Sequence, residues 1–347
     1  MIGFSVYLDH ELTAADHDYM LRMRNAGFSG VFTSLRLEVA PAELLARLQE
    51  LTKWCSDLGL TCLTDVSAAA LARLGIATSD RDALAALHVT SFRLGADFSL
   101  PQIAELSAQF VLYLNANLMT STYLDELKSY SANLANIAVA HESYPRPATG
   151  LDTEWFLRQN AWLKQAGLKV LAFVAGDGCL SGPLKQGLPT LEQDRYRNPL
   201  AAILCMKSMG LTEIYIADCR LSETSLAQLE YYQKQHGFLL HLAQAVPALS
   251  EVAWHQRSDV ARDVVRLAEG PSRQLELTGP VLARSVGAIT LDQGAAAPLP
   301  GELEIMKVAW PAVAGVVTVA QVIAYDLPLL GLIGASAPIK FATNKNS

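Results

Sequence analysis

The chain has 347 residues, of which 51% are hydrophobic and 18% are charged, so it has ample apolar material for a buried core and too little charge for extensive disorder. The length predicts one large domain and a smaller one. The formal net charge of −7 and the absence of a basic run argue against a nucleic-acid partner, so any phosphate ligand is expected to bind a few local cations.

Three further features of the sequence bear on the cell compartment. The five cysteines show no C-x-x-C or Cys/His metal spacing, which favours reduced thiols in a cytoplasmic protein with no metal and no other cofactor. The first residues lack a positive leader and meet an acid at Asp9, which indicates a first strand and not a signal peptide. The apolar stretch Val313–Gly334 is interrupted by Gln321, Asp326 and Pro328, so we interpret it as buried strands and a short helix and expect no membrane partner.

Along the chain, short apolar runs alternate with segments whose apolar residues recur at helical spacing. The predicted strands are Ile2–Leu8, Gly30–Leu35, Thr61–Val66, Ser91–Leu94, Phe110–Asn115, Ile137–Ala140, Val170–Ala175 and Glu213–Ala217. The predicted helices are Asp16–Asn25, Ala42–Asp57, Leu124–Ser131, Asp152–Gln165, Pro199–Met209 and Glu223–Gln235. This alternation is typical of parallel strands joined by crossover helices, and hence of an α/β fold.

Glycine marks the entry to four of the predicted strands. Gly27, Gly59, Gly167 and Gly210 each stand between a helical segment and an apolar Phe or Leu, where a left-handed residue ends a helix. Eight such units within residues 1–240 match the size of a (β/α)8 TIM barrel. No Gly-rich phosphate fingerprint favours a doubly wound sheet instead.

The pattern changes after residue 240. A Pro-containing link leads to a predicted helix at Ser258–Ala268, and short β-rich pieces follow, including Leu303–Val308 and Val313–Ala324. We expect a second, small, mainly β domain over residues 250–347.

In a TIM barrel the chemistry lies at the carboxyl ends of the strands, so polar residues there are candidate site residues. These are Asp9, Arg36, Asp65, Arg93, Asn115, His141, Glu142, Tyr144, Arg146, Asp177 and Asp218. Carboxylates mixed with arginines suit acid/base work on an anionic, hydroxyl-rich ligand.

Two of these acids have the same context. Asp65 and Asp218 each follow four mostly apolar residues, and desolvation at the buried end of a strand raises a carboxyl pKa into the range of a general acid. The alternative is a helix cap, in which Asp65 with Ser67, or Asp218 with Ser222, satisfies free amide groups. Both interpretations stay open.

The segment His141–Leu151 reads H-E-S-Y-P-R-P-A-T-G-L. Its prolines exclude a helix interior and hold Arg146 on a stiff arm, which indicates the rim of a ligand site or else a plain Pro-rich turn. Arg36 and Arg93 are further anion-binding candidates, or they form ordinary salt bridges. His141 is a base, an orienting group or a buried structural donor.

Four motifs occur in a specific order: G-F-x-G-V-F-T-S-L at Gly27–Leu35, H-x-x-Y-P-R-P-x-T-G-L at His141–Leu151, F-V-x-G-D-G…G-P…G-L-P-T-L-E at Phe173–Glu192 and G-E-L at Gly301–Leu303. Together they resemble the MupG-type 6-phospho-N-acetylmuramidases. The similarity extends over nearly the whole chain, is dense in the first 235 residues and is thin after Ser250.

This resemblance implies a (β/α)8 barrel followed by a small cyclophilin-like β domain. It also implies a cytoplasmic glycoside hydrolase of peptidoglycan recycling, whose small-molecule substrate is N-acetylmuramic acid 6-phosphate-N-acetylglucosamine. Such chemistry needs an acid and a second carboxylate, for which Asp65, Asp218 and Asp9 are candidates. Arg93, Arg146 and the loop at 176–187 are then candidates for the phosphate or the lactyl carboxylate. The sequence leaves open whether the chain forms an oligomer.

The chain departs from the family pattern at several positions. Gly95 stands where the resemblance implies an acid, Glu142 where it implies Asn, Arg36 where it implies His, and Leu180-Ser181 where it implies an Arg. A non-catalytic sugar-phosphate binding protein on a degenerate barrel, or a glycosidase with an altered substrate, therefore remains an alternative.

Overall fold

The computed structural model describes residues 1–273 and 275–343. By internal contacts the chain divides into two units, Met1–Glu223 and a second unit that begins at Thr224. The last four residues of the small domain expected over 250–347 lie outside the described residues.

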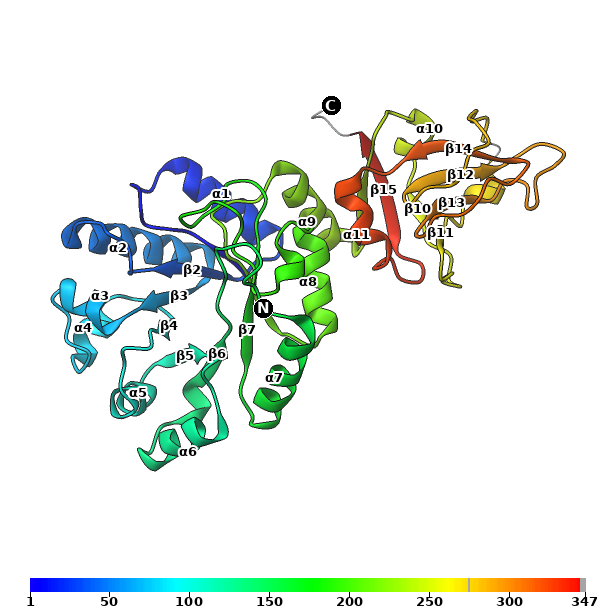
Figure 1. Cartoon of the computed structure of the whole chain (residues 1–347). Coiled ribbons are helices and arrows are strands. Elements are labelled where there is room, and N and C mark those ends of the chain that lie inside the picture. Colours follow the sequence, from blue (N-terminus) through cyan, green and yellow to red (C-terminus); the bar gives the residue numbers. More distant parts are fainter. Residues whose placement is uncertain (274, 344–347) are drawn as a thin grey trace. The chain divides into compact units, whose positions relative to one another are not determined.

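The first unit is a closed barrel of eight parallel strands in chain order, which confirms the predicted TIM-barrel fold (Figure 1). The strands are β1 (Ile2–Ser5), β2 (Gly30–Ser34), β3 (Thr61–Val66), β4 (Ser91–Leu94), β5 (Val111–Asn115), β6 (Ile137–Ala140), β7 (Val170–Val174) and β8 (Glu213–Ile216). All eight strands predicted from the apolar runs and the helix-ending glycines are therefore present, and only the first is clearly shorter than predicted.

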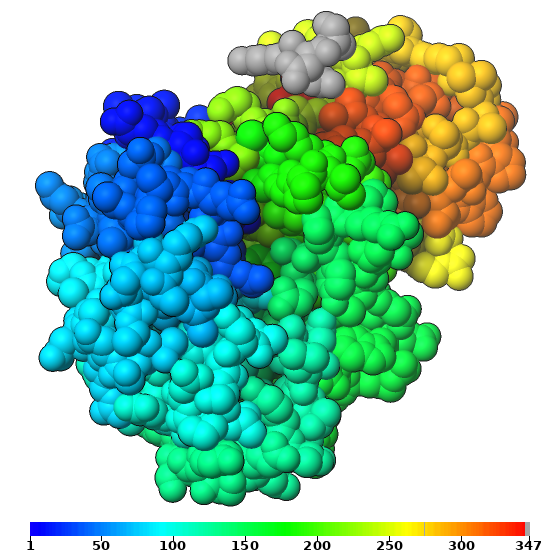
Figure 2. Space-filling model, turned by 60° about the vertical axis from the view of Figure 1, so that its left-hand side comes forward, coloured from blue at the N-terminus to red at the C-terminus, as the bar shows by residue number. Residues whose placement is uncertain are grey.

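Helices lie outside these strands (Figure 1), and successive stretches of the chain follow one another around this unit from blue through cyan to green (Figure 2). They are α1 (Ala14–Asn25), α2 (Pro41–Leu58), α3 (Ala68–Arg73), α4 (Arg81–Ala85), α5 (Leu100–Ser107), α6 (Ser121–Ser129), α7 (Thr153–Gln165) and α8 (Pro199–Ser208); α9 (Glu223–Gln235) follows β8. The short helices α3, α4 and α5 were not predicted, because five to eight residues give little periodic signal.

The predicted glycine turns are present. Gly27, Gly59, Gly167 and Gly210 all have positive φ angles between 66° and 87°. At the end of α2, Gly59 has φ 66°, and the amide of the next residue, Leu60, donates to the carbonyl of Cys55 at 2.8 Å. This bond closes the last turn of the helix before β3 begins.

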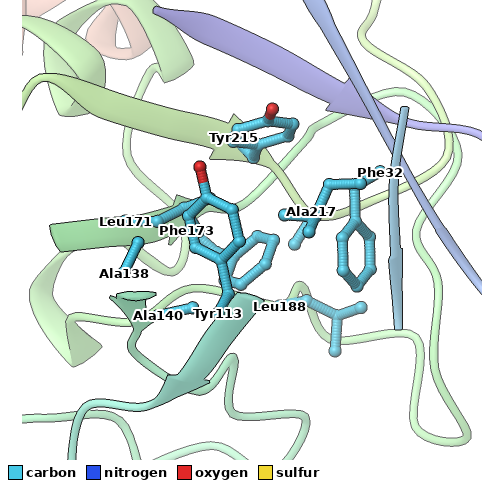
Figure 3. Close-up of a cluster of buried hydrophobic side chains, with 10 residues drawn as sticks. Phe32, Tyr113, Ala138, Ala140, Leu171, Phe173, Leu188, Tyr215 and Ala217 are labelled. Atoms are coloured by element: carbon cyan, nitrogen blue, oxygen red, sulfur yellow. The ribbon is translucent and has the colours of Figure 1, made fainter. Parts of the chain in front are cut away.

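The barrel interior is packed with apolar side chains that point toward one another (Figure 3). The cluster consists of Phe32, Leu63, Tyr113, Ala138, Ala140, Leu171, Phe173, Leu188, Tyr215 and Ala217. Side chains two residues apart on a strand point to the same side. Asp65 follows Leu63, and Asn115 follows Tyr113, so these polar side chains face the barrel axis one layer closer to its carboxyl end.

The second unit contains two sheets, ordered β10-β15-β9 and β11-β13-β12-β14. Their strands are β9 (Phe238–Leu242), β10 (Trp254–His255), β11 (Val264–Arg266), β12 (Ala288–Asp292), β13 (Leu303–Met306), β14 (Val316–Gln321) and β15 (Pro338–Thr343), with short helices α10 (Pro247–Ser250) and α11 (Leu327–Leu330). This arrangement confirms a small β-sheet unit after the barrel.

Two details of the second unit differ from the sequence analysis. The prediction of a helix at Ser258–Ala268 is wrong. Val264–Arg266 forms the strand β11, which pairs antiparallel with β13, and its two β-branched valines favour the strand conformation. The strand β9 was not predicted, and it pairs in parallel with β15 from the far end of the chain. Among the described residues, no helix has the length and apolar character needed to cross a membrane.

Candidate active site

Five polar residues from neighbouring strand ends form one connected network, which we call the acid–arginine cluster: Ser34, Asp65, Arg93, Asn115 and Glu142. Arg93 lies at its centre, because one terminal nitrogen donates to Asp65 at 2.9 Å and the other donates to Glu142. Ser34 donates to Asp65 at 3.1 Å, and the Asn115 amide donates to Glu142 at 2.9 Å. One guanidinium thus holds two carboxylates in place.

The cluster lies in a poorly solvated part of the barrel. Asp65 is 6% exposed, and burial raises the pKa of its carboxyl group even though Arg93 and the more distant Arg36 lower it. Arg36 is half exposed, and its guanidinium lies 3.7 Å from the Asp65 carboxylate. Burial lowers the pKa of Arg93, but its two carboxylate partners more than offset this effect. Asp65 is therefore a carboxyl group with a raised pKa beside a fixed positive charge.

The cap alternative for Asp65 is not what the structure shows. The side chain of Ser67 accepts from the amide of Ala70 at 3.0 Å, and Asp97 accepts from the amide of Ala69 at 3.1 Å, so these two residues cap α3. Asp65 instead directs its carboxylate to Arg93 and Ser34.

A second polar set adjoins the cluster. His141 is fully buried, and its Nδ1 and Nε2 atoms lie 2.9 Å and 2.7 Å from the side-chain carbonyl oxygens of Asn117 and Asn160, respectively. The Asn117 amide also donates to the hydroxyl of Tyr144 at 2.7 Å. Burial lowers the pKa of His141 to about 4, so the ring is neutral at pH 7. This places His141 as an orienting group for Tyr144 through Asn117.

The buried His141 predicts a specific acid sensitivity. Because its folded-state pKa is about 4 against a usual 6.5, the unfolded chain binds more protons between these values, and stability falls as the pH falls through this window. Between pH 7 and pH 4, the wild type is expected to lose about 3 kcal/mol more than His141→Gln. Urea unfolding at both pH values checks this, and parallel pH profiles for the two proteins would contradict it.

The structure places Asp218 differently from Asp65, although their sequence contexts match. Its carboxylate accepts three backbone N–H groups, from Gly176 at 2.9 Å, Ser181 at 2.7 Å and Leu188 at 3.1 Å. Burial raises the Asp218 pKa, and these amides lower it. Asp218 thus satisfies free amides, as the alternative interpretation held, but they belong to the loop after β7 and not to the next helix.

Asp218→Asn is accordingly expected to destabilise the protein by about 2 kcal/mol, because the amide offers one acceptor oxygen and places a donor against backbone N–H groups. Chemical denaturation at pH 7 measures this loss. An unchanged unfolding midpoint would show that the carboxylate does not anchor the loop.

Three other candidates lie outside the acid–arginine cluster. Asp9 is largely exposed and pairs with His10 at 2.8 Å. Asp177 accepts from the amide and the hydroxyl of Ser222 at 2.9 and 2.6 Å, and thereby ties the loop after β7 to the segment before α9. Arg146 is exposed at the rim.

Sequence reasoning missed several residues that shape this site. Asn117 and Asn160 were not among the candidate residues, yet the side chains of both contact the His141 ring. Arg195 and Glu192 form an ion pair at 2.7 Å, and Arg195 also donates to the backbone carbonyls of Tyr144 and Arg146. Glu192 was part of a recognised motif, but nothing local in the sequence marked Arg195.

The fold and the site together define a TIM-barrel protein with a buried acid–arginine cluster at the carboxyl ends of its strands. Residues 2–231 match the family model described as 6-phospho-N-acetylmuramidase, N-terminal, and residues 242–342 match the model described as 6-phospho-N-acetylmuramidase, C-terminal. The chain therefore belongs to the 6-phospho-N-acetylmuramidase family, as the sequence motifs indicated.

Two solved structures are similar to this chain over nearly its whole length. The crystal structure of a conserved protein of unknown function from Enterococcus faecalis is 33% identical, with a TM-score of 0.89 over 99% of this chain and 97% of that chain. The structure of an uncharacterized B. cereus protein is 23% identical, with a TM-score of 0.68 over 98% of this chain and 99% of that chain, and supports the fold. A comparison with curated proteins found no match.

Within residues 1–273 and 275–343, no group of three or more His, Cys, Asp or Glu side chains is arranged to hold a metal ion.

Proposed function

We propose that this protein is a cytoplasmic glycoside hydrolase of peptidoglycan recycling that cleaves N-acetylmuramic acid 6-phosphate-N-acetylglucosamine. The observation that carries the proposal is the pair of carboxylates, Asp65 and Glu142, held by Arg93 at the mouth of a barrel that belongs to this family. Glycosidases commonly use two carboxyl groups that flank the scissile bond.

In this proposal Asp65 is the general acid. Burial raises the pKa of its carboxyl group, and this direction favours the protonated form that a general acid needs in order to donate to the oxygen of the leaving sugar. Glu142 is the second carboxylate: its side chain is 38% exposed, and Arg93 and Asn115 keep it oriented. This assignment moves Glu142 from substrate binding to chemistry, whereas Asp218 anchors a loop.

The step itself breaks the bond between the anomeric carbon and the bridging oxygen. Asp65 protonates that oxygen, while Glu142 either deprotonates the attacking water or attacks the anomeric carbon itself. Carboxyl groups about 5–5.5 Å apart use the second route with retention, and groups about 6.5–9.5 Å apart use the first with inversion. Proton NMR of the first-formed anomer distinguishes the two routes.

Substrate binding is assigned to groups around the cluster. The exposed guanidinium groups of Arg36 and Arg146 are suited to the phosphate and the lactyl carboxylate, because planar donors bind such anions in a bidentate manner. The hydroxyl of Tyr144, already oriented by Asn117, is suited to a sugar hydroxyl.

The direct test is incubation of purified protein with the phosphorylated disaccharide and with its unphosphorylated analogue. Release of both sugars, faster from the phosphorylated compound, is the expected result. Asp125→Asn serves as a control variant, because this acid is exposed on α6 and pairs with Lys128 at 2.9 Å. A protein that releases sugar from neither compound would contradict the proposal.

A second candidate function is non-catalytic sugar-phosphate binding. The observation that favours it is the ion pairing of the same two carboxylates, since a guanidinium that neutralises both acids also lowers their capacity for proton transfer. Thermal stabilisation by the phosphorylated disaccharide without any product would support this alternative over hydrolysis.

The cyclophilin-like architecture implied for the second unit also stays a prediction. A crystal structure of the full chain, compared with cyclophilin-like domains, would test it.

A further inference from the structure

An ion pair between the buried Arg195 and the partly buried Glu192 contacts the segment that carries Tyr144 and Arg146. Arg195 is 3% exposed, and it follows a short turn after the loop from β7. Its side chain binds Glu192 through two nitrogens, both at 2.7 Å. The Arg195 hydrogen bonds lower the pKa of Glu192 to about 2, so the pair stays charged at any physiological pH.

Every donor of Arg195 is used. Besides the two bonds to Glu192, its guanidinium donates to the carbonyl oxygens of Tyr144 at 2.8 Å, Gly187 at 2.9 Å and Arg146 at 3.1 Å. A guanidinium has five N–H groups in a fixed fork, and five are engaged here. A lysine ammonium has three donors and cannot reproduce this geometry.

Glu192 is saturated in the same way. Its two oxygens accept from the backbone amides of Ala148 at 2.9 Å and Gly150 at 2.7 Å, in addition to Arg195. A Cβ atom on Gly150 would lie 2.7 Å from the Glu192 carboxylate, so glycine is needed for this approach. Ala148 has a φ of 65°, a left-handed conformation that an alanine keeps only where its surroundings enforce it.

The ion pair thus joins two loops that are far apart in sequence. Backbone bonds from Tyr144 to Pro189, at 2.9 Å, and from Leu151 to Thr190, at 2.8 Å, run beside it. The Thr190 hydroxyl also donates to the carbonyl of Glu142 at 3.0 Å. We call the ion pair of Arg195 and Glu192 the clamp. It binds the backbone of the segment whose side chains, Tyr144 and Arg146, contact the ligand in the proposed function.

We propose that Arg195 and Glu192 are positioning residues that fix the Tyr144–Arg146 arm for substrate binding. Neither residue needs to touch the substrate. This inference rests on the proposed function for its kinetic readout, whereas its structural content is independent of any activity.

The test compares Arg195→Lys and Glu192→Gln with Arg197→Lys. Arg197 is a matched control in the same segment, because its guanidinium pairs with Asp194 at 3.4 Å, which is not part of the arm. We expect KM for the phosphorylated disaccharide to rise at least about 10-fold in the clamp variants, with kcat within about 3-fold of wild type, because displacing a binding arm removes ground-state and transition-state contacts alike.

A merely structural role predicts the opposite pattern, since a smaller folded fraction lowers apparent kcat and leaves KM unchanged. That result would overturn the inference. Hydrogen exchange of the unliganded protein supplies the second readout: the amides of Ala148 and Gly150 should lose protection in Glu192→Gln and keep it in Arg197→Lys. Unchanged protection would also overturn it. If the wild type shows no turnover, the proposed function fails, and the exchange result still decides whether the clamp exists.

Discussion

Asp65→Asn is expected to lower kcat by about 10²–10⁴-fold, the usual contribution of a positioned general acid. The amide oxygen of Asn can still accept from Arg93, and the Ser34 hydroxyl can rotate to accept from the new amide nitrogen. Arg93 also keeps Glu142, so we expect the melting temperature to stay nearly unchanged. Steady-state kinetics and a thermal melt on the same preparation separate the two effects.

The pH profile sharpens this prediction. Burial raises the Asp65 pKa, so the wild-type rate should fall at the alkaline side as this carboxyl loses its proton, at a pH above the usual carboxyl range. The residual activity of Asp65→Asn should not show this fall of the rate at alkaline pH, whereas Asp125→Asn should keep the wild-type pH–rate profile. Wild-type turnover in Asp65→Asn would remove this residue from the chemistry.

Arg93→Met is expected to cost about 3–5 kcal/mol of folding free energy at pH 7, because it leaves Asp65 and Glu142 together without their shared cation. Methionine fills much of the volume, so the loss reports charge and not a cavity. Urea unfolding at pH 7 and pH 4 measures it.

The sign of the pH effect follows from the like charges. Without Arg93, each carboxylate raises the folded-state pKa of the other, so stability present below the unfolded-state pKa is lost as the pH rises. The deficit relative to wild type should therefore be smaller at pH 4 than at pH 7. Arg158→Met is the control, because its pair with Glu154 is exposed and 3.6 Å long. An equal deficit at both pH values would contradict a charge-based account.

Much of the site was predictable because parallel strands bring their carboxyl ends together. Asp65, Arg93, Asn115 and Glu142 were all named from strand-end positions, and the structure joins them in one cluster. Predicting that these residues lie close together required only the order of the strands, which the alternation of strands and helices and the glycine turns indicated.

The same reasoning did not separate Asp65 from Asp218. Both come after four mostly apolar residues, but the amides that Asp218 binds come from the loop after β7, 30–42 residues earlier in the chain, and no local pattern specifies that contact. The clamp formed by Arg195 and Glu192 was missed for the same reason, since its bonds to Tyr144 and Arg146 span about 50 residues of sequence. Long-range loop contacts leave no periodic signal.

Hydrolysis of the phosphorylated disaccharide is the central claim, and its direct test is a time course of the purified wild type with N-acetylmuramic acid 6-phosphate-N-acetylglucosamine followed by NMR. We predict that the bridging linkage disappears as both free sugars appear in equal amounts, and that Asp65→Asn slows this conversion at least about 100-fold. Saturable binding of the disaccharide to the wild type with no loss of the linkage would contradict the account.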